Sequence, residues 1–287
     1  MKKGLTLGIM FEAQSANYGE GFGNITELKK ITRGNGNGYT YISRQAIRNN
    51  MIEQLGWDTT PVEAMGSGDK KVIQFKQDTS IIDYPEIDLF GYMKTTKKEG
   101  AKTRAAVVRL SNAISLEPFY ADMDFLTNKG MSNRIHANSS IAQSEIHKSF
   151  YTYSITIDLD RVGIDGAQEV DNNEKAKRVV SLLRTVEYLY HDIKGRRESF
   201  VPIFIIGGMY DRKTPFFENR IQLNRGVLNI QMLQEVMETI SEDTEIGCAC
   251  GIFKNEEEVK KNLKPQSINH MISSLCKKVE EAFDESN

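Results

Sequence analysis

The sequence predicts an α+β protein built on a βαββαβ core, and three observations support this prediction. The stretch from Tyr151 to Leu159 alternates apolar and polar residues, which is typical of a half-buried strand. Two segments, about 43–55 and 174–194, repeat apolar residues at the spacing of amphipathic helices. The strong elements follow the order strand, helix, strands, polar excursion, strand, helix, strand. That order fits a ferredoxin-like or RNA-recognition fold with long insertions.

The first elements can be assigned from apolar runs and capping residues. Gly4 to Phe11 is apolar and predicts a buried first strand. The polar, glycine-rich segment 13–38 follows, and a connection this long is uncommon in a compact domain and often functional. Tyr39 to Ile42 favours a strand. Ser43 is then a good N-cap for a helix that Gly56 would end.

The middle of the chain mixes short strands with polar stretches. Residues 72–75 and 87–93 predict strand or edge pieces around an irregular middle, and 104–116 predicts a mixed strand region. Residues 125–148 are polar and rich in small side chains. This segment predicts an excursion from the core in the form of a protruding hairpin.

Helices dominate the last part of the predicted fold. The expected elements are a helix at about 174–194, a buried strand at 200–206 that stops at Gly207-Gly208, a helix capped by Asn229 and ending at Ile240, and two C-terminal helices at 256–263 and 268–283.

Composition limits the class of protein. With 287 residues, 39% of them apolar and 26% charged, the chain can bury one large core. No apolar run has membrane-spanning length, and the segment after Met1-Lys2-Lys3 is typical of a strand, not a signal peptide, so no membrane partner is expected. Three cysteines, Cys248, Cys250 and Cys276, indicate a reducing cytoplasm and buried free thiols. Their spacing does not fit a zinc site, so no metal or other cofactor is expected.

Charge is distributed unevenly along the chain. The net charge is −2, but residues 28–52 hold five basic residues and no acidic one. Residues 94–109 hold six basic residues against Glu99 alone, whereas from Glu235 onward acids outnumber bases 12 to 6. Because phosphate binding depends on local charge, the folded chain can present a basic groove and an acidic outer side. Solvated surface charge is the alternative for either basic run.

One segment, 31–48, combines features of a phosphate-binding site. It has a glycine loop whose backbone can approach a ligand closely, and a capped helix start whose amides can bind anions. Arg44 and Arg48 lie one turn apart and can fork onto phosphate oxygens, while Tyr39 or Tyr41 could stack on a base. An ordinary surface loop with core tyrosines would explain the same residues.

The sequence also resembles the DevR family, the backbone subunits of type I-B Cascade complexes within the RAMP superfamily. The similar stretches occur in the family's order along nearly the whole chain. They are Gly19-Glu-Gly-Phe-Gly-Asn24, Glu27-Leu-Lys-Lys-Ile-Thr-Arg33, Tyr39-Thr-Tyr-Ile-Ser-Arg-Gln-Ala-Ile-Arg48, Asp88-Leu-Phe-Gly-Tyr-Met93, Arg104-Ala-Ala-Val-Val-Arg109, His147-Lys-Ser-Phe-Tyr-Thr-Tyr153, Ile157-Asp-Leu-Asp-Arg-Val-Gly163 and Ile205-Ile-Gly-Gly208.

The resemblance implies a single domain shaped like a right hand. The palm would be the ferredoxin-like core (about 1–60, 104–116 and 149–240), with fingers at 60–103, a thumb hairpin at 125–148 and C-terminal helices at 254–285. Copies would stack head to tail along a guide RNA (crRNA), and the guide would pair with target DNA. Other implied partners are a large PAM-reading subunit, a subunit that caps the guide's 5′ end and a guide-processing endonuclease.

Candidate guide-binding residues follow from the same motifs. Around the first helix they are Lys30, Arg33, Tyr39, Ser43, Arg44, Gln45 and Arg48; at the thumb they are Asn133, Arg134 and His136; after the last core strand they are Gly207, Gly208 and Arg212. The second basic stretch supplies candidate target-DNA contacts, namely Lys94, Lys97, Lys98 and Lys102. The segment from Gly207 to Lys213 is short and includes Asp211. In both respects it departs from the glycine-rich basic loop of the family.

The sequence does not predict an enzyme. The four histidines are scattered, and no Ser/His/Asp or Cys/His set can be assigned. Related subunits of type III complexes cleave target RNA with an aspartate between the first strand and the first helix, but here the first aspartate is Asp58. A RAMP-type ribonuclease of target RNA or guide precursor remains the alternative, and a metabolic ferredoxin-like protein with an incidental basic loop is a third reading.

Overall fold

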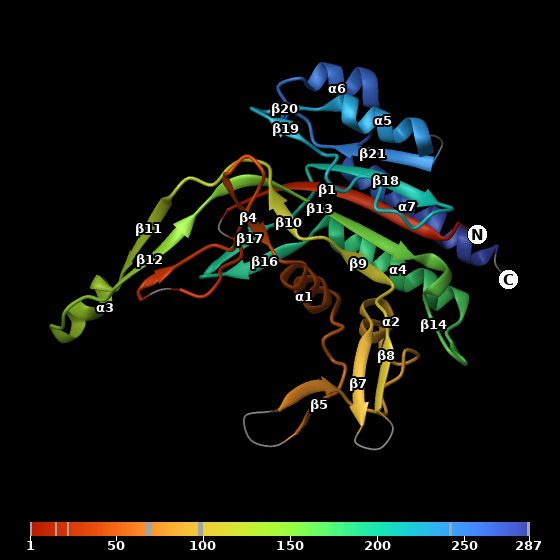
Figure 1. Cartoon of the computed structure of the whole chain (residues 1–287), viewed down its shortest axis with the longest axis horizontal. Coiled ribbons are helices and arrows are strands. Elements are labelled where there is room, and N and C mark those ends of the chain that lie inside the picture. The colour runs from red at the N-terminus through yellow and green to blue at the C-terminus, as the bar shows by residue number, and fades with distance from the viewer. Residues whose placement is uncertain are drawn as a thin grey trace.

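The fold is organised around one antiparallel sheet (Figure 1). A computed structural model of the chain describes residues 2–14, 16–21, 23–66, 71–96, 100–240 and 243–285. In sheet order the strands are β21 (Thr244–Cys248), β18 (Phe204–Tyr210), β1 (Gly4–Gln14), β13 (Lys148–Asp158), β10 (Ala113–Ser115), β4 (Gly38–Ile42) and β3 (Lys30–Thr32), and β9 (Val108–Leu110) also pairs with β13.

The centre of the sheet has four strand positions, occupied by β18, β1, β13 and, at the fourth, both β9 and β10. β1 lies between β18 and β13 and is antiparallel to both, and β13 is antiparallel to β9 and β10. Along the chain, helix α1 (Arg44–Leu55) follows β1 and precedes β9 and β10. Helix α4 (Asn172–Glu187) comes between β13 and β18. The α+β class is confirmed, and this strand order fits the expected βαββαβ core.

Each face of the sheet is covered by helices. On one face α1, α4 and α7 (Ile268–Asp284) bury a core that contains Leu7, Met51 and Leu275. On the other face α5 (Ile230–Ile240) and α6 (Glu256–Leu263) pack over Phe204 and Ile246. In the described part of the chain no helix is long and apolar enough to cross a membrane.

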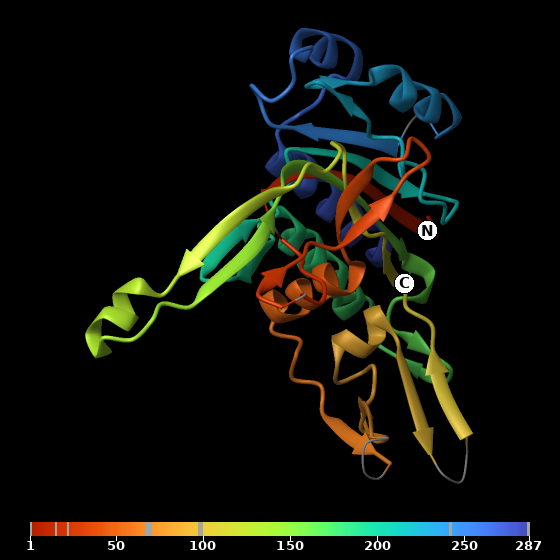
Figure 2. The ribbon, with the colours of Figure 1, turned by 60° about the vertical axis from the view of Figure 1, so that its left-hand side comes forward.

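A long hairpin projects from the sheet, as expected for the polar excursion (Figures 1 and 2). β11 (Asp122–Thr127) and β12 (Ile141–Ile146) pair over their whole length. The tip carries α3 (Lys129–Ser132) and a 3₁₀ turn (Asn133–Ile135), and β2 (Ile25–Thr26) pairs with β12 in parallel. We call 122–146 the hairpin.

A second projection, the 62–104 insertion, leaves the core in another direction (Figure 2). It contains β5 (Val62–Met65), β6 (Val72–Phe75), α2 (Pro85–Phe90), β7 (Tyr92–Thr96) and β8 (Gly100–Arg104). The strand expected at 87–93 is wrong over its first half, which is helical. Pro85 occupies the first turn of α2 together with Glu86 and Asp88, and both residue types favour a helix start.

A buried ion network anchors this insertion to the core. Asp88 in α2 is fully buried, and its Oδ1 accepts a hydrogen bond from Arg104 Nη2 at 2.6 Å. Its Oδ2 accepts one from Arg178 Nη1 of α4 at 2.9 Å, and the Gly163 amide donates to both oxygens at 3.0 Å. One carboxylate therefore joins α2, β8, α4 and the end of β13.

The end of α4 also differs from the sequence prediction. The helix expected to reach about 194 ends at Glu187 and is followed by a hairpin of β16 (Tyr190–Ile193) and β17 (Arg196–Ser199). Lys194 (φ 47°) and Gly195 (φ 77°) form its turn, and positive φ at both positions suits a two-residue hairpin. Short pairs complete the fold: β14 (Ile164–Asp165) with β15 (Gln168–Glu169), and β19 (Leu223–Asn224) with β20 (Val227–Leu228).

The three cysteines are free thiols, as expected, but only Cys276 is buried. Cys248 is half-buried and Cys250 is exposed, so the prediction of burial was wrong for Cys250. The apolar neighbours of the cysteine pair in the sequence do not cover Cys250, which follows the end of β21.

Candidate nucleic-acid interface

Helix α1 begins where the sequence predicts, and its first amides are satisfied within the protein. Ser43 Oγ accepts a hydrogen bond from the Ala46 amide at 3.3 Å, and the Arg44 amide donates to Asn112 Oδ1 at 2.9 Å. The Ser43 amide donates to Asn17 Oδ1 at 3.1 Å. Ser43 is therefore an N-cap that shapes the loop, and these amides are not free to bind a phosphate.

The arginines of α1 lie on the outside of the helix. Arg44 and Gln45 are exposed, and Arg48 is half-buried with its guanidinium over the Phe90 ring at 5.6 Å. These three side chains and Arg109 of β9 line a cavity of about 360 Å³. Figures 1 and 2 show α1 in the angle between the hairpin and the 62–104 insertion.

Arg33 extends the row of positive charge past the start of the helix. It lies with Arg44 along a second cavity, of about 230 Å³. We call Arg33, Arg44, Gln45 and Arg48 the α1 strip. Within the described ranges no carboxylate forms an ion pair with its three arginines, so their charge is available to a polyanion. Arg109 differs, because its guanidinium lies 3.0 Å from Asp158 Oδ2.

Glu86 of α2 is an acid near the Arg48 end of the strip. Burial raises the pKa of its carboxyl above the ordinary value, while a hydrogen bond from Thr60 and the charge of Arg48 lower it in part. Glu86 and Arg48 both line the cavity between α1 and the insertion. Glu86 therefore limits the positive potential at this end of the strip.

Tyr39 packs against Arg33 of the α1 strip. Its ring is buried, its hydroxyl accepts a hydrogen bond from Asn35 Nδ2 at 2.9 Å, and the Arg33 guanidinium lies 5.0 Å from the ring centroid. The expectation that Tyr39 could stack on a base is wrong for this conformation, since Arg33 covers the ring. Tyr39 instead positions Arg33 by a cation–π contact.

Lys30 has a structural partner that the sequence could not reveal. Its Nζ lies 2.6 Å and 2.9 Å from the two carboxylate oxygens of Glu145 on β12, and 4.9 Å from the Phe119 ring centroid. Lys30 stays a predicted guide-binding residue, but its ammonium is paired with Glu145 in this structure. Lys30 ties β3 to the base of the hairpin, and its charge is largely balanced there.

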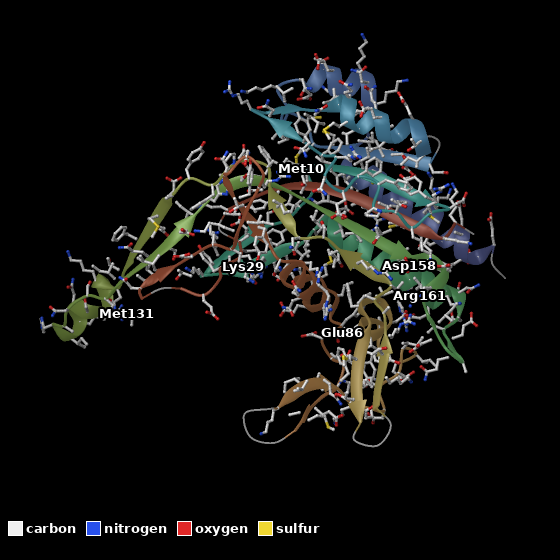
Figure 3. The ribbon with its side chains drawn as sticks, viewed as in Figure 1. Met10, Lys29, Glu86, Met131, Asp158 and Arg161 are labelled. Atoms are coloured by element: carbon white, nitrogen blue, oxygen red, sulfur yellow. The ribbon has the colours of Figure 1, made fainter. Side chains whose placement is uncertain are left out.

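The predicted tip residues are at the tip. Asn133, Arg134 and His136 are exposed on the short helical turns at the end of the hairpin. Figure 3 shows the labelled Met131 at this tip and Lys29 near the hairpin's base, beside the core. The tip also exposes large apolar side chains, with Met131 67% and Ile135 75% accessible. The tip and the α1 strip are separate surfaces.

Gly207 and Gly208 are not in a turn, so this placement was wrong. They lie inside β18, buried between β1 and β21. A Cβ at Gly207 would collide with the Thr6 carbonyl oxygen, and one at Gly208 with the Asp243 carbonyl oxygen. The glycines let three strands pack closely, which removes them from the candidate interface. Arg212 is exposed after β18 but lines a different cavity, with Lys2 and Asp243.

The second basic stretch is only partly on the surface. Lys94 is 1% accessible, its Nζ donates to the Thr79 carbonyl at 2.6 Å, and burial lowers its pKa. Its predicted contact with target DNA is therefore wrong. Lys102 is exposed on β8, with Nζ 6.0 Å from the Tyr92 ring centroid. Lys97 and Lys98 lie outside the described residues.

His147 and His191 each contact a buried polar side chain. His147 Nδ1 lies 2.7 Å from Thr40 Oγ1, which in turn lies 2.7 Å from the Tyr151 hydroxyl. His191 Nδ1 lies 2.9 Å from Asn50 Oδ1. Burial lowers the pKa of both imidazoles, which favours their neutral form. Neither contact places a histidine beside a serine or cysteine nucleophile.

Some residues at the site were missed by the sequence reasoning. Arg109 and Asn112 flank α1 from the loop and strand that follow the insertion, and Glu218 and Gln222 line the 230 Å³ cavity from the segment after β18. Arg109 lies in one of the similar motifs, and its exposed position in a strand was the available signal. Nothing in the sequence places 218–222 beside Arg44.

The sheet, its two projections and the α1 strip define an α+β protein with a candidate surface for a polyanion. The chain belongs to the DevR/Csa2 family, since the model described as "CRISPR-associated negative auto-regulator DevR/Csa2" matches residues 5–226. No curated protein sequence matches the chain.

Solved structures share the fold at low sequence identity. A chain of a "CRISPR RNA-guided surveillance complex" matches with a TM-score of 0.58 and 14% identity, over 94% of this chain and 99% of that one. A chain of a "CRISPR RNA-guided surveillance complex, pre-nicking" matches with a TM-score of 0.59 and 11% identity, over 95% and 100%. In both matches nearly the whole of each chain is covered.

Proposed function

We propose that this protein is a guide-RNA-binding backbone subunit of a CRISPR surveillance complex, and that its copies stack head to tail along the guide. The α1 strip carries the proposal, because its three arginines have no carboxylate partner among the described residues and line two cavities that share Arg44. Family membership and the shared fold with chains of surveillance complexes support it.

In this proposal the fold acts as a right hand. The sheet with α1 and α4 is the palm, the hairpin is the thumb and the 62–104 insertion is the fingers. The guide's phosphates follow the α1 strip, and its bases remain open to pair with target DNA. Base pairing then supplies specificity, and the protein holds the backbone through charge that is independent of sequence.

The remaining partners follow from the same proposal. We propose that Lys102, which is exposed on the insertion, contacts target DNA. A large PAM-reading subunit, a subunit at the guide's 5′ end and a guide-processing endonuclease would complete the assembly.

The proposal includes binding without cleavage. The segment between β1 and α1 contains no aspartate, and its acids are Glu20 and Glu27. Glu12, at the end of β1, lies 3.3 Å from Lys148 Nζ. The aspartate with which related type III subunits cleave target RNA is missing from this segment, and its absence supports binding without cleavage. Metal-dependent cutting of a paired RNA target by the assembled complex would contradict this part of the proposal and favour the ribonuclease alternative.

Purification from cells that express the whole complex tests the binding proposal. The expected result is co-purified RNA of uniform length that nuclease digestion trims at regular intervals. The regular intervals distinguish a stacked backbone from a single incidental binding site. An RNA-free monomer in the same preparation would instead favour a protein with no guide.

A further inference from the structure

A polar cavity of about 230 Å³ lies on the sheet face opposite α1, α4 and α7. Thr152 and Ser154 of β13 form part of its floor, and Arg33 and Arg44 of the α1 strip stand at one side. The segment 217–222 closes the other side. The cavity is smaller than the roughly 300–1,000 Å³ of pockets that enclose a whole small molecule, so it suits one unit of a polymer.

The far wall is fixed by two apolar anchors. Phe217 and Ile221 are buried against the core, and Gly8 of β1 makes room for them, since a Cβ at Gly8 would approach Phe217 Cβ to 2.7 Å. The residues between and after these anchors are polar. Glu218 and Gln222 therefore line the cavity from a segment held firmly against the sheet.

Glu218 places a carboxylate inside a basic site. Ser154 Oγ donates to Glu218 Oε2 at 3.4 Å, a long contact that locates the carboxylate above the sheet. Among the described residues no lysine, arginine or histidine forms an ion pair with it. A phosphate alone would be repelled by this group, whereas a hydroxyl donor beside the phosphate would satisfy it.

We infer that this cavity binds the ribose of one guide nucleotide, with Glu218 accepting a hydrogen bond from the 2′-hydroxyl while Arg33 and Arg44 bind the adjacent phosphates. The inference rests on the proposed function and adds a means of choosing RNA over DNA. The 2′-hydroxyl is the donor that RNA has and DNA lacks. Because every ribonucleotide carries it, this contact is compatible with any guide sequence.

Single-stranded oligonucleotides of one sequence test the inference with the full-length protein. The probes are RNA, its 2′-deoxy form and its 2′-O-methyl form, which cannot donate. Wild-type protein is expected to bind RNA more tightly than both others. Glu218→Ala is expected to lower the RNA-to-DNA affinity ratio about tenfold, the value of one hydrogen bond to a charged group.

Two variants separate hydrogen bonding from charge. Glu218→Gln changes the net charge as Glu218→Ala does but keeps an acceptor oxygen, so its ratio is expected to lie between wild type and Glu218→Ala. Glu238→Gln, an exposed change on α5, removes the same charge elsewhere and is expected to leave the ratio unchanged. Arg44→Ala is expected to weaken RNA and DNA binding in equal proportion.

The outcomes distinguish this inference from the proposed function. A wild-type protein that binds neither RNA nor DNA contradicts the proposed function. RNA binding with a ratio that Glu218→Ala does not change, or equal affinity for RNA and its 2′-O-methyl form, overturns the inference and leaves the proposed function standing.

Discussion

Two arginines on α1 provide the most direct test of guide binding. Arg44 is exposed and Arg48 half-buried one turn later, and neither has an ion-pair partner among the described residues. Replacing both with alanine removes two contacts to phosphate. For a single strand each lost contact lowers the slope of log K against log salt by about 0.7, so the double variant is expected to lose about 1.4. Equilibrium binding at several salt concentrations measures this slope.

A matched variant controls for net charge. Lys261→Ala with Lys277→Ala removes two exposed cations from α6 and α7, on the acidic side of the chain. Its salt slope is expected to equal that of the wild type. An Arg44→Ala and Arg48→Ala variant with an unchanged slope would show that the guide does not follow the α1 strip.

Asp88 provides the corresponding test of stability. Its carboxylate is the shared acceptor for Arg104 and Arg178, both nearly fully buried. Removing one partner of a buried ion cluster leaves uncompensated charge and costs about 3–5 kcal/mol. Asp88→Ala is expected to lower the free energy of unfolding by that amount in urea titration.

The control for Asp88 is a carboxylate on the same segment. Asp83 is exposed, and changes at such surface sites usually stay within about 0.5 kcal/mol. Asp83→Ala should therefore unfold at the wild-type urea concentration. If Asp88→Ala did so too, the network would not anchor the insertion.

Among the secondary-structure elements, those with local signals were predictable. Ser43 caps the start of α1 and Gly56 caps its end, each through hydrogen bonds within a few residues. Both capping residues can be recognised in the sequence. β18 was cut short at Gly207 because a glycine pair is a turn signal, and its real role depends on β1 and β21. Such a role needs partners that the local sequence does not display.

For the candidate site residues, local geometry could be predicted from the sequence and contacts with distant segments could not. Arg44 and Arg48 share a helix face through local geometry. Lys30 and Lys94 both lie in basic stretches of the sequence. In the fold, the Glu145 carboxylate pairs with Lys30, and the Thr79 carbonyl accepts a hydrogen bond from the buried Lys94. Burial by distant segments decides which lysine can meet a phosphate.

The hairpin can be shortened without disturbing the sheet. Its last strand pair joins Thr127 to Ile141, and the tip side chains beyond it are largely exposed. Replacing residues 128–140 with Asn-Gly makes a two-residue hairpin turn. The melting temperature is expected to change by less than about 2–4 °C, the effect of 1 kcal/mol in a domain of this size.

The shortened hairpin is expected to change assembly but not binding by one copy. RNA affinity at low protein concentration should remain, since the α1 strip is intact, and ordered stacking on long RNA should be lost. Analytical ultracentrifugation with RNA measures both. Normal stacking by the shortened protein would remove the hairpin from the contact between copies.

The two projections carry apolar groups that could serve the head-to-tail stacking proposed above. The hairpin exposes Phe125 and Leu126, and the insertion exposes Val62, Ile73 and Met93. Under the proposed function these apolar groups are available for contacts between copies. The two sets lie on different elements that point in different directions (Figures 1 and 2), so contacts between copies need not be self-complementary. A heterologous contact that does not close generates a helical stack.

Copy number is therefore expected to rise in proportion to RNA length. In the proposed stack each copy would occupy a fixed stretch of phosphates along its α1 strip, so longer RNA would add copies without changing the contact between them. Mass photometry of the protein with RNAs of increasing length measures the number bound, and the protein without RNA provides the reference mass. A complex with the same copy number at every RNA length would show a closed oligomer, and the head-to-tail stack would then be wrong.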